Sequence, residues 1–303
     1  MGDLMAQVYK SMQEIQSDKC KELTLTFIDT GLEYPEIREF VPEFAKYLRE
    51  KYGIKVGLET VKPSMKFPEV IRKYGYPVIA KEVAQTLYSG KKGQRTALLK
   101  INGLDKNGNP SKFRKRYLKY KYLLDAHYQV SSKCCDVMKK KPVIMFEKRT
   151  GKKPIIATLA EESQLREKMW IQNGCNAFYA DRPKSTPISF WTEKDTLRYL
   201  KKTGIPYASV YGEIVEQDNQ LSFIDDGNES IHTTGCDRTG CVFCMFGIMS
   251  DKTPNRFQRM KNTHPKLYEY CIGGGIYDES GMLQPTKNGL GIGKVLDYIG
   301  IPY

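Results

Sequence analysis

The sequence predicts an α/β fold with a parallel sheet and a helical C-terminal lobe. Helical and strand patterns alternate over residues 4–61, as in proteins whose parallel strands are covered by helices. The length of 303 residues is typical of about two domains. Hydrophobic residues make up 40% and charged residues 27%, a globular composition that excludes a disordered chain, a collagen and a coiled-coil rod.

Two kinds of pattern define the elements of the N-terminal part. Apolar residues that recur on one face predict amphipathic helices, and a short continuous run such as L-T-L-T-F-I predicts a buried strand. The predicted elements are, in order, a helix over 4–15, a strand over 23–28, a helix over 35–52 and a strand over 54–61.

The rest of the chain reads as more helical. The turn signal N-G-N-P precedes a basic, tyrosine-rich helix, and Gly204 ends a later one. The predicted elements are a helix over 111–124, a strand over 154–159, helices over 160–172, 193–203 and 292–299, and a hairpin or loop over 212–235. We expect residues 1–210 to form the α/β core, with a basic helical insertion at 91–153, and residues 211–303 to form the C-terminal lobe.

The predicted start of the chain is unusual for this fold class. A parallel α/β domain usually begins with a strand, and a glycine-rich loop at the following helix binds phosphate. Here the first predicted element is a helix, and no such loop precedes it. Either the first strand and the phosphate loop are missing, or this helix is a peripheral addition; the residues alone leave both open.

Basic residues concentrate in one segment. The chain has a net charge of +13, and residues 91–153 hold 19 Lys or Arg against four acids, a local net charge of +15. This excess predicts an anionic partner such as a nucleotide, sulfate or nucleic acid. Basic and aromatic residues interleave over 113–122, which suits a nucleic-acid strand. The alternative is an amphipathic helix with a solubilising basic face.

Cysteine spacing predicts a metal centre. Cys241 and Cys244 form a C-x2-C, and the tandem pair Cys134 and Cys135 would complete four sulfur ligands for an iron–sulfur cluster or zinc. The alternative for the tandem pair is burial as small apolar residues. A rival zinc site uses only local ligands, namely His232, Cys236, Cys241 and Cys244. The other cysteines, Cys20, Cys175 and Cys271, are expected in the core.

The expected location is a reducing cytoplasm. No signal peptide is evident, and no stretch approaches the about 18 apolar residues of a membrane span. Clustered cysteines in such a chain indicate metal or redox chemistry rather than a disulfide framework.

An anion site is predicted where A-E-E-S-Q-L-R, residues 160–166, follows a predicted strand and opens a helix. Ser163 and Arg166 would hold an oxyanion there, the arginine through bidentate contact. The alternative is an ordinary helix N-terminus, whose first turn favours acids. Three scattered histidines allow no Ser-His-Asp set and no H-E-x-x-H, which argues against hydrolases of those kinds.

Five segments resemble the phosphoadenosine phosphosulfate (PAPS) reductase-like family of the PP-loop ATP pyrophosphatase superfamily. They are F-I-D-T-G-L-E-Y-P-E (27–36), K-C-C-D-V-M-K-K-K-P (133–142), A-E-E-S-x-x-R (160–166), P-I-S-F-W-T-E-K-D (187–195) and R-T-G-C-V-F-C (238–244). They occur in the order of the family. The resemblance implies an adenine nucleotide alpha hydrolase-like core, with ATP or an adenylated substrate over the strand ends.

The resemblance also implies roles for individual residues. The residues that it places near the adenosine are Asp29, Thr30 and Gly31. Those that it places near the substrate anion are Glu162, Ser163, Arg166 and Arg238. In adenylyl-sulfate reductases of this group a tandem cysteine pair and a C-x2-C ligate a [4Fe–4S] cluster. The matching residues here are Cys134, Cys135, Cys241 and Cys244.

Two departures from the family pattern matter. The S-G-G-x-D-S phosphate loop does not occur, and the helix near the N-terminus resembles the one that follows this loop, which indicates a shortened chain. Sulfonucleotide reductases carry an attacking cysteine near the C-terminus, whereas Cys271, the last cysteine here, has a different context. This argues against a thioredoxin-linked sulfonucleotide reductase. Some relatives modify nucleic acids with sulfur.

We therefore expect an enzyme that acts on an adenylated or ATP substrate by sulfur transfer or sulfonucleotide reduction, with a [4Fe–4S] cluster. The alternative is a catalytically inactive nucleotide- or nucleic-acid-binding protein with a structural metal such as zinc. No residue is assigned as catalytic. A homo-oligomer is compatible with the sequence.

Overall fold

The computed structural model describes residues 2–14, 23–217, 230–236 and 238–303. The chain forms two compact units, which we call unit 1 and unit 2. Unit 1 comprises Met1–Asp29, Glu33–Val61 and Val143–Gly240, and unit 2 comprises Thr30–Leu32, Lys62–Pro142 and Cys241–Tyr303. Both units use residues from before and after position 210. The predicted division into a core and a C-terminal lobe at residue 210 stays a prediction.

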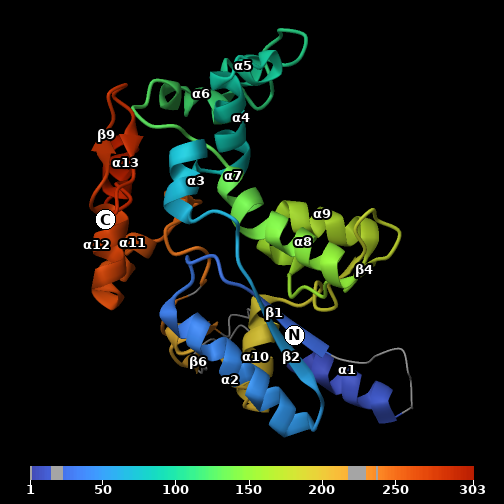
Figure 1. The fold of residues 1–303 in the computed structure, drawn as a ribbon. Coiled ribbons are helices and arrows are strands. Elements are labelled where there is room, and N and C mark those ends of the chain that lie inside the picture. Colours follow the sequence, from blue (N-terminus) through green and yellow to red (C-terminus); the bar gives the residue numbers. More distant parts are fainter. Residues whose placement is uncertain (1, 15–22, 218–229, 237) are drawn as a thin grey trace, which may run out of the picture. The chain divides into compact units, whose positions relative to one another are not determined.

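Two parallel strands, β1 (Leu23–Ile28) and β2 (Val56–Val61), lie side by side in unit 1 (Figure 1). The helix α2 (Pro35–Tyr52) connects them, as a parallel pair requires a crossover. The helix α1 (Gly2–Glu14) contacts α2 and β1. The core cluster of this region consists of Ala6, Leu48, Ile54 and Val56.

The remaining elements of unit 1 are short. They are α8 (Lys141–Thr150, whose first two residues belong to unit 2), η3 (Ala160–Glu162), α9 (Gln164–Asn173), β4 (Asn176–Ala177), β5 (Lys184–Ser185), α10 (Glu193–Thr203), η4 (Ser209–Tyr211), β6 (Ile214–Gln217) and β7 (Ser230–Thr233). The expected hairpin corresponds to β6 and β7, which pair antiparallel, and residues 218–229 lie outside the described part.

Unit 2 contains a second parallel pair, in which β3 (Val78–Ile79) pairs with β8 (Met245–Phe246). Three helices of the C-terminal lobe, α11 (Arg256–Thr263), α12 (Pro265–Ile272) and α13 (Ile292–Tyr298), pack in sequence. The other elements are α3 (Phe67–Tyr74), α4 (Lys81–Lys91), α5 (Arg95–Ile101), α6 (Arg114–Leu118), η1 (Lys121–Leu124), α7 (Lys133–Cys135), η2 (Asp136–Lys140), η5 (Ile248–Ser250), β9 (Ile276–Tyr277) and β10 (Leu283–Gln284). The α/β class with parallel strands is thus confirmed.

Strong local signals gave accurate element boundaries. The strand predicted over 23–28 and the helices predicted over 35–52 and 193–203 match β1, α2 and α10 residue for residue. Both helices end at a glycine in the left-handed region, Gly53 at φ 64° and Gly204 at φ 62°. A glycine adopts this conformation without the clash of a Cβ atom, which is why it stops a helix.

Two predicted elements are wrong. Residues 154–159 form no strand. They pair with the rest of the protein through one β-bridge, from Ile155 to Ser185, and the side chains of Ile155 and Ile156 are exposed. The helix predicted over 111–124 is broken into α6 and the 3-10 turn η1. Like charges spaced four residues apart, as at Lys115 and Lys119, disfavour one continuous helix.

Two expectations remain predictions. The first is that a strand and a phosphate loop, which would precede α1, are missing. The cytoplasmic location is the second of these. Among the helices described, none combines the length and the apolar character needed to cross a bilayer.

Candidate functional site

The turn after β1 is the first predicted site element. The Asp29 amide donates to the Val61 carbonyl over 3.0 Å, and Arg38 on α2 donates to the Asp29 carboxylate over 2.8 Å. Thr30 is buried, and its hydroxyl accepts from the Leu32 amide over 3.2 Å. Gly31 has a φ of 80°, a conformation that glycine adopts readily. The sequence D-T-G therefore forms a tight, internally bonded turn at the carboxyl end of the strand.

Within unit 2 this turn is bonded to the C-x2-C loop. The Val242 amide donates to the Leu32 carbonyl over 2.8 Å. The loop closes on itself through a 3.0 Å bond from the Cys244 amide to the Cys241 carbonyl, and Cys244 leads directly into β8. A backbone bond at one end and a strand at the other hold the two cysteines in place.

The tandem cysteines lie on α7, also in unit 2. The two Sγ atoms are 4.0 Å apart, and the Cys134 thiol donates to Cys135. The chain continues directly into the five-residue π-helix η2. Such π-turns inside helices often occur at functional sites. Both cysteine pairs predicted as ligands therefore belong to the same compact unit.

The charges of these four thiols affect one another. The pKa of Cys134 is raised by its hydrogen bond to Cys135, by burial and by the charges of Cys244 and Cys241. Burial and the charges of Cys241 and Cys135 raise the pKa of Cys244 to about 11. A hydrogen bond from the Phe246 amide acts in the opposite direction and lowers that pKa in part. The bond from Cys134 lowers the pKa of Cys135 to about 6, aided by nearby lysines. Four thiolates here would repel one another unless a cation neutralised them.

The donor set has the number and type of ligands of an iron–sulfur cluster. Among the residues described, no group of three or more His, Cys, Asp or Glu side chains gathers closely enough to hold one metal ion. In a [4Fe–4S] cluster four cysteines bind four different irons, so the thiolates need not converge on one point. Their number, thiol chemistry, at least partial burial and mutual repulsion suit such a group.

The rival local zinc site draws on both units. His232, on β7, and Cys236 belong to unit 1, whereas Cys241 and Cys244 belong to unit 2. The His232 side chain is exposed. The Cys236 amide donates to the Val210 carbonyl over 3.0 Å. This rival site stays a prediction. Of the cysteines expected in the core, Cys271 is fully buried, Cys175 is half-buried and Cys20 lies outside the described residues.

In unit 1 the residues predicted to bind an anion open α9. The Ser163 hydroxyl accepts from the Arg166 amide over 3.3 Å and so caps the helix, as the structural alternative predicts. The Glu162 carboxylate accepts from the Leu159 amide over 3.4 Å and forms an ion pair with Arg166. Arg166 remains about two-fifths exposed on its side chain. All three residues therefore have local partners, and the Arg166 side chain keeps part of its surface exposed.

The charge of Arg238 acts on Arg166. Burial and then the positive charge of Arg238 lower the pKa of Arg166. Two neighbouring guanidinium groups repel each other, and an anion between them would remove that repulsion. Both arginines, which the family resemblance assigns to the substrate anion, belong to unit 1, and that assignment stays a prediction.

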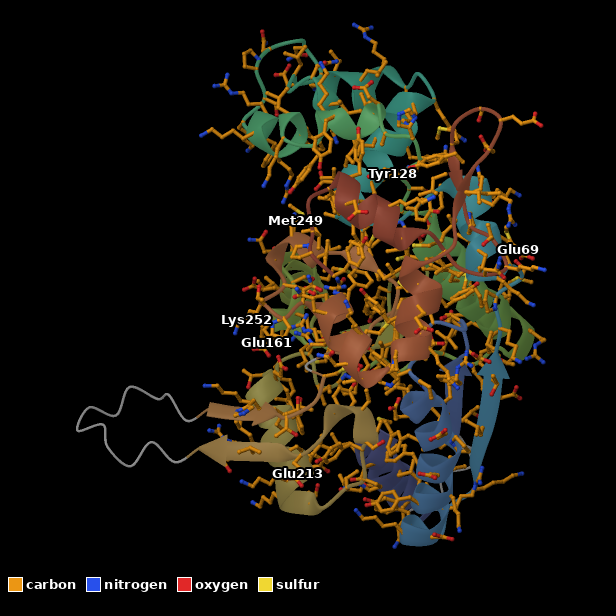
Figure 2. All side chains as sticks on the ribbon, turned by 90° about the vertical axis from the view of Figure 1, so that its left-hand side faces the viewer. Glu69, Tyr128, Glu161, Glu213, Met249 and Lys252 are labelled. Atoms are coloured by element: carbon orange, nitrogen blue, oxygen red, sulfur yellow. The ribbon has the colours of Figure 1, made fainter. Side chains whose placement is uncertain are left out.

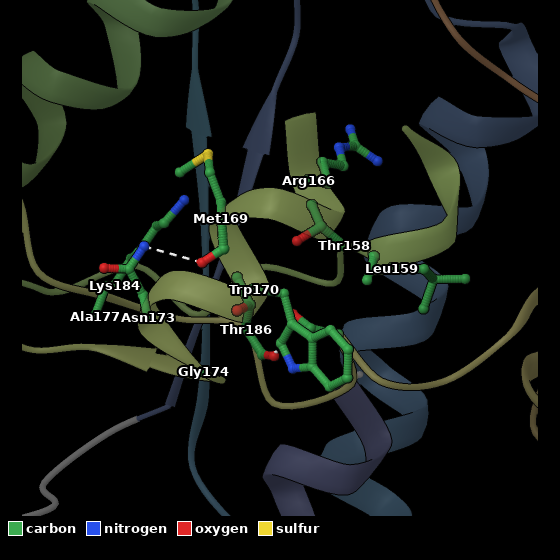
Figure 3. A pocket seen from close by; sticks show the side chains of 12 residues that line it. Thr158, Leu159, Arg166, Met169, Trp170, Asn173, Gly174, Ala177, Lys184 and Thr186 are labelled. Atoms are coloured by element: carbon green, nitrogen blue, oxygen red, sulfur yellow. Dashed lines mark hydrogen bonds between the residues drawn. The ribbon is translucent and has the colours of Figure 1, made fainter. Parts of the chain in front are cut away.

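A small cavity adjoins Arg166 (Figure 3). Its volume is about 40 Å³, room for only a few water-sized groups. That space suits an oxyanion and is far below the several hundred Å³ of a pocket for a whole nucleotide. Its lining includes a second cation, Lys184, the hydroxyls of Thr158, Thr186 and Ser189, and the indole of Trp170.

Sequence reasoning missed most of this lining. Ser189 belongs to the segment P-I-S-F-W-T-E-K-D, which matched the family pattern without a role. Its carbonyl accepts from the Ala160 amide over 2.8 Å, and Glu161 accepts from the Glu193 amide. The segment thus links α10 to η3, the turn that precedes α9 and Arg166. The one sequence signal for Ser189 was that its segment follows the A-E-E-S segment in the order of the family's motifs.

The comparisons with known proteins agree with the resemblance. Residues 92–246, about half of the chain, match the family described as phosphoadenosine phosphosulfate reductase domain. The crystal structure of phosphoadenylyl-sulfate (PAPS) reductase from Candida auris, a phosphate complex, is similar over 67% of this chain and 71% of that chain, at 12% identity and a TM-score of 0.27. A similarity that weak places no residue. No curated protein matches the chain.

Proposed function

This chain belongs to the phosphoadenosine phosphosulfate reductase domain family, and we propose that it is an enzyme of sulfur chemistry that acts on an adenylated substrate. One observation carries the proposal. Four thiols from two distant segments, 133–135 and 241–244, belong to one compact unit, and the charges of Cys241 and Cys244 act on Cys134. The C-x2-C loop is bonded to the turn that follows β1, the turn expected near the adenosine.

We assign a [4Fe–4S] cluster to Cys134, Cys135, Cys241 and Cys244. When bound, the cluster supplies iron charge that offsets the four thiolates. The chain contributes the rest. The Phe246 amide donates to the Cys244 Sγ over 3.4 Å, and Arg256 donates to the Cys244 carbonyl over 3.0 Å. These bonds fix the loop and reduce the negative charge at its last ligand.

Arg166 and Arg238 are assigned to the sulfate or phosphate of the substrate. A guanidinium binds two oxygens of such a group at once, which gives both charge and orientation. The cavity beside Arg166, with Lys184 and the hydroxyl of Thr158, has room for one such group. The adenosine would lie outside it, since the cavity is too small for a nucleotide.

We assign the attacking thiol to an external dithiol rather than to Cys271. Cys271 is fully buried on α12, and burial raises its pKa, so it is a poor nucleophile. With adenylyl sulfate as substrate, an external dithiol would supply two electrons. Sulfite and AMP would leave, and the dithiol would become a disulfide. The same thiol burial also favours a second candidate, an inactive nucleotide-binding protein whose metal is structural.

The test starts with metal content. Protein purified without oxygen should contain about four irons per chain, and Cys241→Ser and Cys134→Ala should each lose most of that iron. Cys175→Ser is the matched control and should retain it. One zinc and no iron would instead favour the local set that contains His232 and Cys236.

Turnover then separates the two candidates. Adenylyl sulfate and a dithiol are supplied, and sulfite and AMP are measured. Arg166→Ala should raise KM at least about tenfold, because a charge-assisted bond is lost. Arg182→Ala is the control, since Arg182 in the same unit pairs with Glu147. Nucleotide binding without sulfite or any sulfur transfer would favour the inactive protein.

A further inference from the structure

Residues 91–121 of unit 2, which we call the basic module, carry the densest positive charge of the chain. The module contains eleven Lys or Arg and one acid, Asp105. Every one of the eleven basic side chains is exposed. They are Lys91, Lys92, Arg95, Lys100, Lys106, Lys112, Arg114, Lys115, Arg116, Lys119 and Lys121.

The fold of the module sorts its residues by polarity. Ala97, Ile101 and Tyr117 are buried where α4, α5 and α6 pack together. The Tyr117 hydroxyl donates to Glu82 on α4 over 2.6 Å and ties α6 to that helix. The basic residues remain outside, and the side chains of this teal segment, above the Tyr128 label, spread outward in Figure 2. The module is a packed scaffold with a cationic exterior.

Little of this charge is neutralised within the protein. In the described part of the chain, the ion pair that the module makes joins Arg116 to Glu82 over 3.0 Å, and both side chains are 58% exposed. Lys121 donates to the neutral Asn102 side chain, and Lys91 to the Tyr128 carbonyl. The surface therefore keeps a strong positive potential, which attracts a polyanion.

Aromatic side chains are exposed among these cations. Phe113 is 55% exposed, with the Lys112 ammonium 5.1 Å from its ring centre. Tyr122, just after the module, is 39% exposed and lies 5.8 Å from the ring of Tyr298. Exposed rings cost free energy in water, whereas unpaired bases stack on them favourably. A duplex hides its base faces, so this combination suits a single strand.

We propose that the basic module binds single-stranded nucleic acid. The lysines and arginines contact its phosphates, and Phe113 and Tyr122 stack on its bases. The inference goes beyond the proposed function, because this binding requires neither the cysteines nor an adenylated substrate.

The test measures binding of a fluorescently labelled single-stranded oligonucleotide of mixed sequence at several salt concentrations. The triple variant Lys112→Gln, Lys115→Gln, Lys119→Gln should weaken binding at least about tenfold at low salt. It should also reduce the slope of log K against log salt by about 2, since each phosphate contact contributes ~0.7 for single strands. Phe113→Ala should weaken binding about fivefold or more with the slope unchanged, because stacking is not ionic.

A matched variant controls for net charge. Lys46→Gln, Lys55→Gln, Lys194→Gln removes three exposed lysines of unit 1 and should leave binding unchanged. Equal losses in both triple variants would overturn the proposal, as would undetectable binding by the unmodified protein. A duplex bound as tightly as the single strand, or an unaffected Phe113→Ala, would overturn the role of base stacking and leave a general polyanion surface. Iron content and sulfite release should not change in the basic-module variant, so failure here is distinct from failure of the proposed function.

Discussion

The two units differ in how they are held together. Among the residues described, eleven of the twelve largest fully buried side chains belong to unit 2, and Leu48 is the one in unit 1. In unit 1 the helix α9 has no buried residue, and its Leu165 and Ile171 are about 70% exposed. Unit 2 therefore depends on a dense apolar core, whereas unit 1 depends on a small core and on polar contacts.

The chief polar contact of unit 1 surrounds a buried carboxylate. Asp3 is 2% exposed and accepts from Tyr52 over 2.5 Å, from Gln7 over 2.9 Å and from Lys51 over 3.1 Å. These bonds join α1 to α2. The four candidate cluster ligands lie in the better packed unit, which agrees with the need to hold a site rigidly.

The largest expected effect is a matched pair of phenylalanine substitutions. Phe257→Ala in unit 2 removes a fully buried ring and should lower the free energy of unfolding by about 3–5 kcal/mol. Phe178→Ala in unit 1 removes a ring that is 65% exposed and should change it by less than about 0.5 kcal/mol. Urea midpoints measure both. Similar losses at the two sites would break the comparison.

Asp3→Asn should cost unit 1 about 1.5–3 kcal/mol, because the substitution removes a buried charge with several donors. Burial raises the pKa of Asp3, but bonds from Tyr52, Lys51 and Gln7 outweigh it and lower that pKa below its ordinary 3.8. A lowered pKa stabilises the fold above about pH 3.8, and this contribution is lost as the pH falls further. Melting from pH 7 to pH 2 should therefore show a smaller effect of Asp3→Asn at low pH. The exposed Glu279→Gln serves as the control and should behave like the unmodified protein.

The smallest effects come from two helix caps. Asn255 in unit 2 is buried, accepts from the Phe257 and Gln258 amides and donates to the Pro302 carbonyl over 2.6 Å. Asn255→Ala should cost about 1–2 kcal/mol, and Ser163→Ala, which removes one exposed 3.3 Å bond, about 0.5–1 kcal/mol. Thermal melting compares them. A larger loss for Ser163→Ala would contradict the ranking of the two units.

The sequence predicted elements whose signals are local. Pro35 and Gly53 bound α2, and Thr192 with Asp195 forms a capping box that opens α10. The strand over 154–159 failed because pairing depends on a partner strand, and no local pattern reports whether one is present. The basic helix failed because repulsion among its own lysines and arginines outweighed helical periodicity.

The sequence predicted candidate site residues where a motif with a fixed residue spacing defines them. The C-x2-C and the tandem pair identified four thiols, and both pairs belong to unit 2, while their role as ligands stays a prediction. Ser163 shows the limit, since a serine before a helix can cap it or bind a ligand, and here its hydroxyl caps. Lys184 and Thr158 were missed because a cavity assembles residues that no motif links.

The path of the chain has a consequence for how the protein is made. The residues of unit 2 come from three separate segments, the last of which starts at Cys241. A ribosome therefore delivers Cys134 and Cys135 long before Cys241 and Cys244, and the nascent chain carries two thiols without partners. The proposed cluster could form only after Cys244 has been made, and until then these thiols depend on a reducing environment or a chaperone.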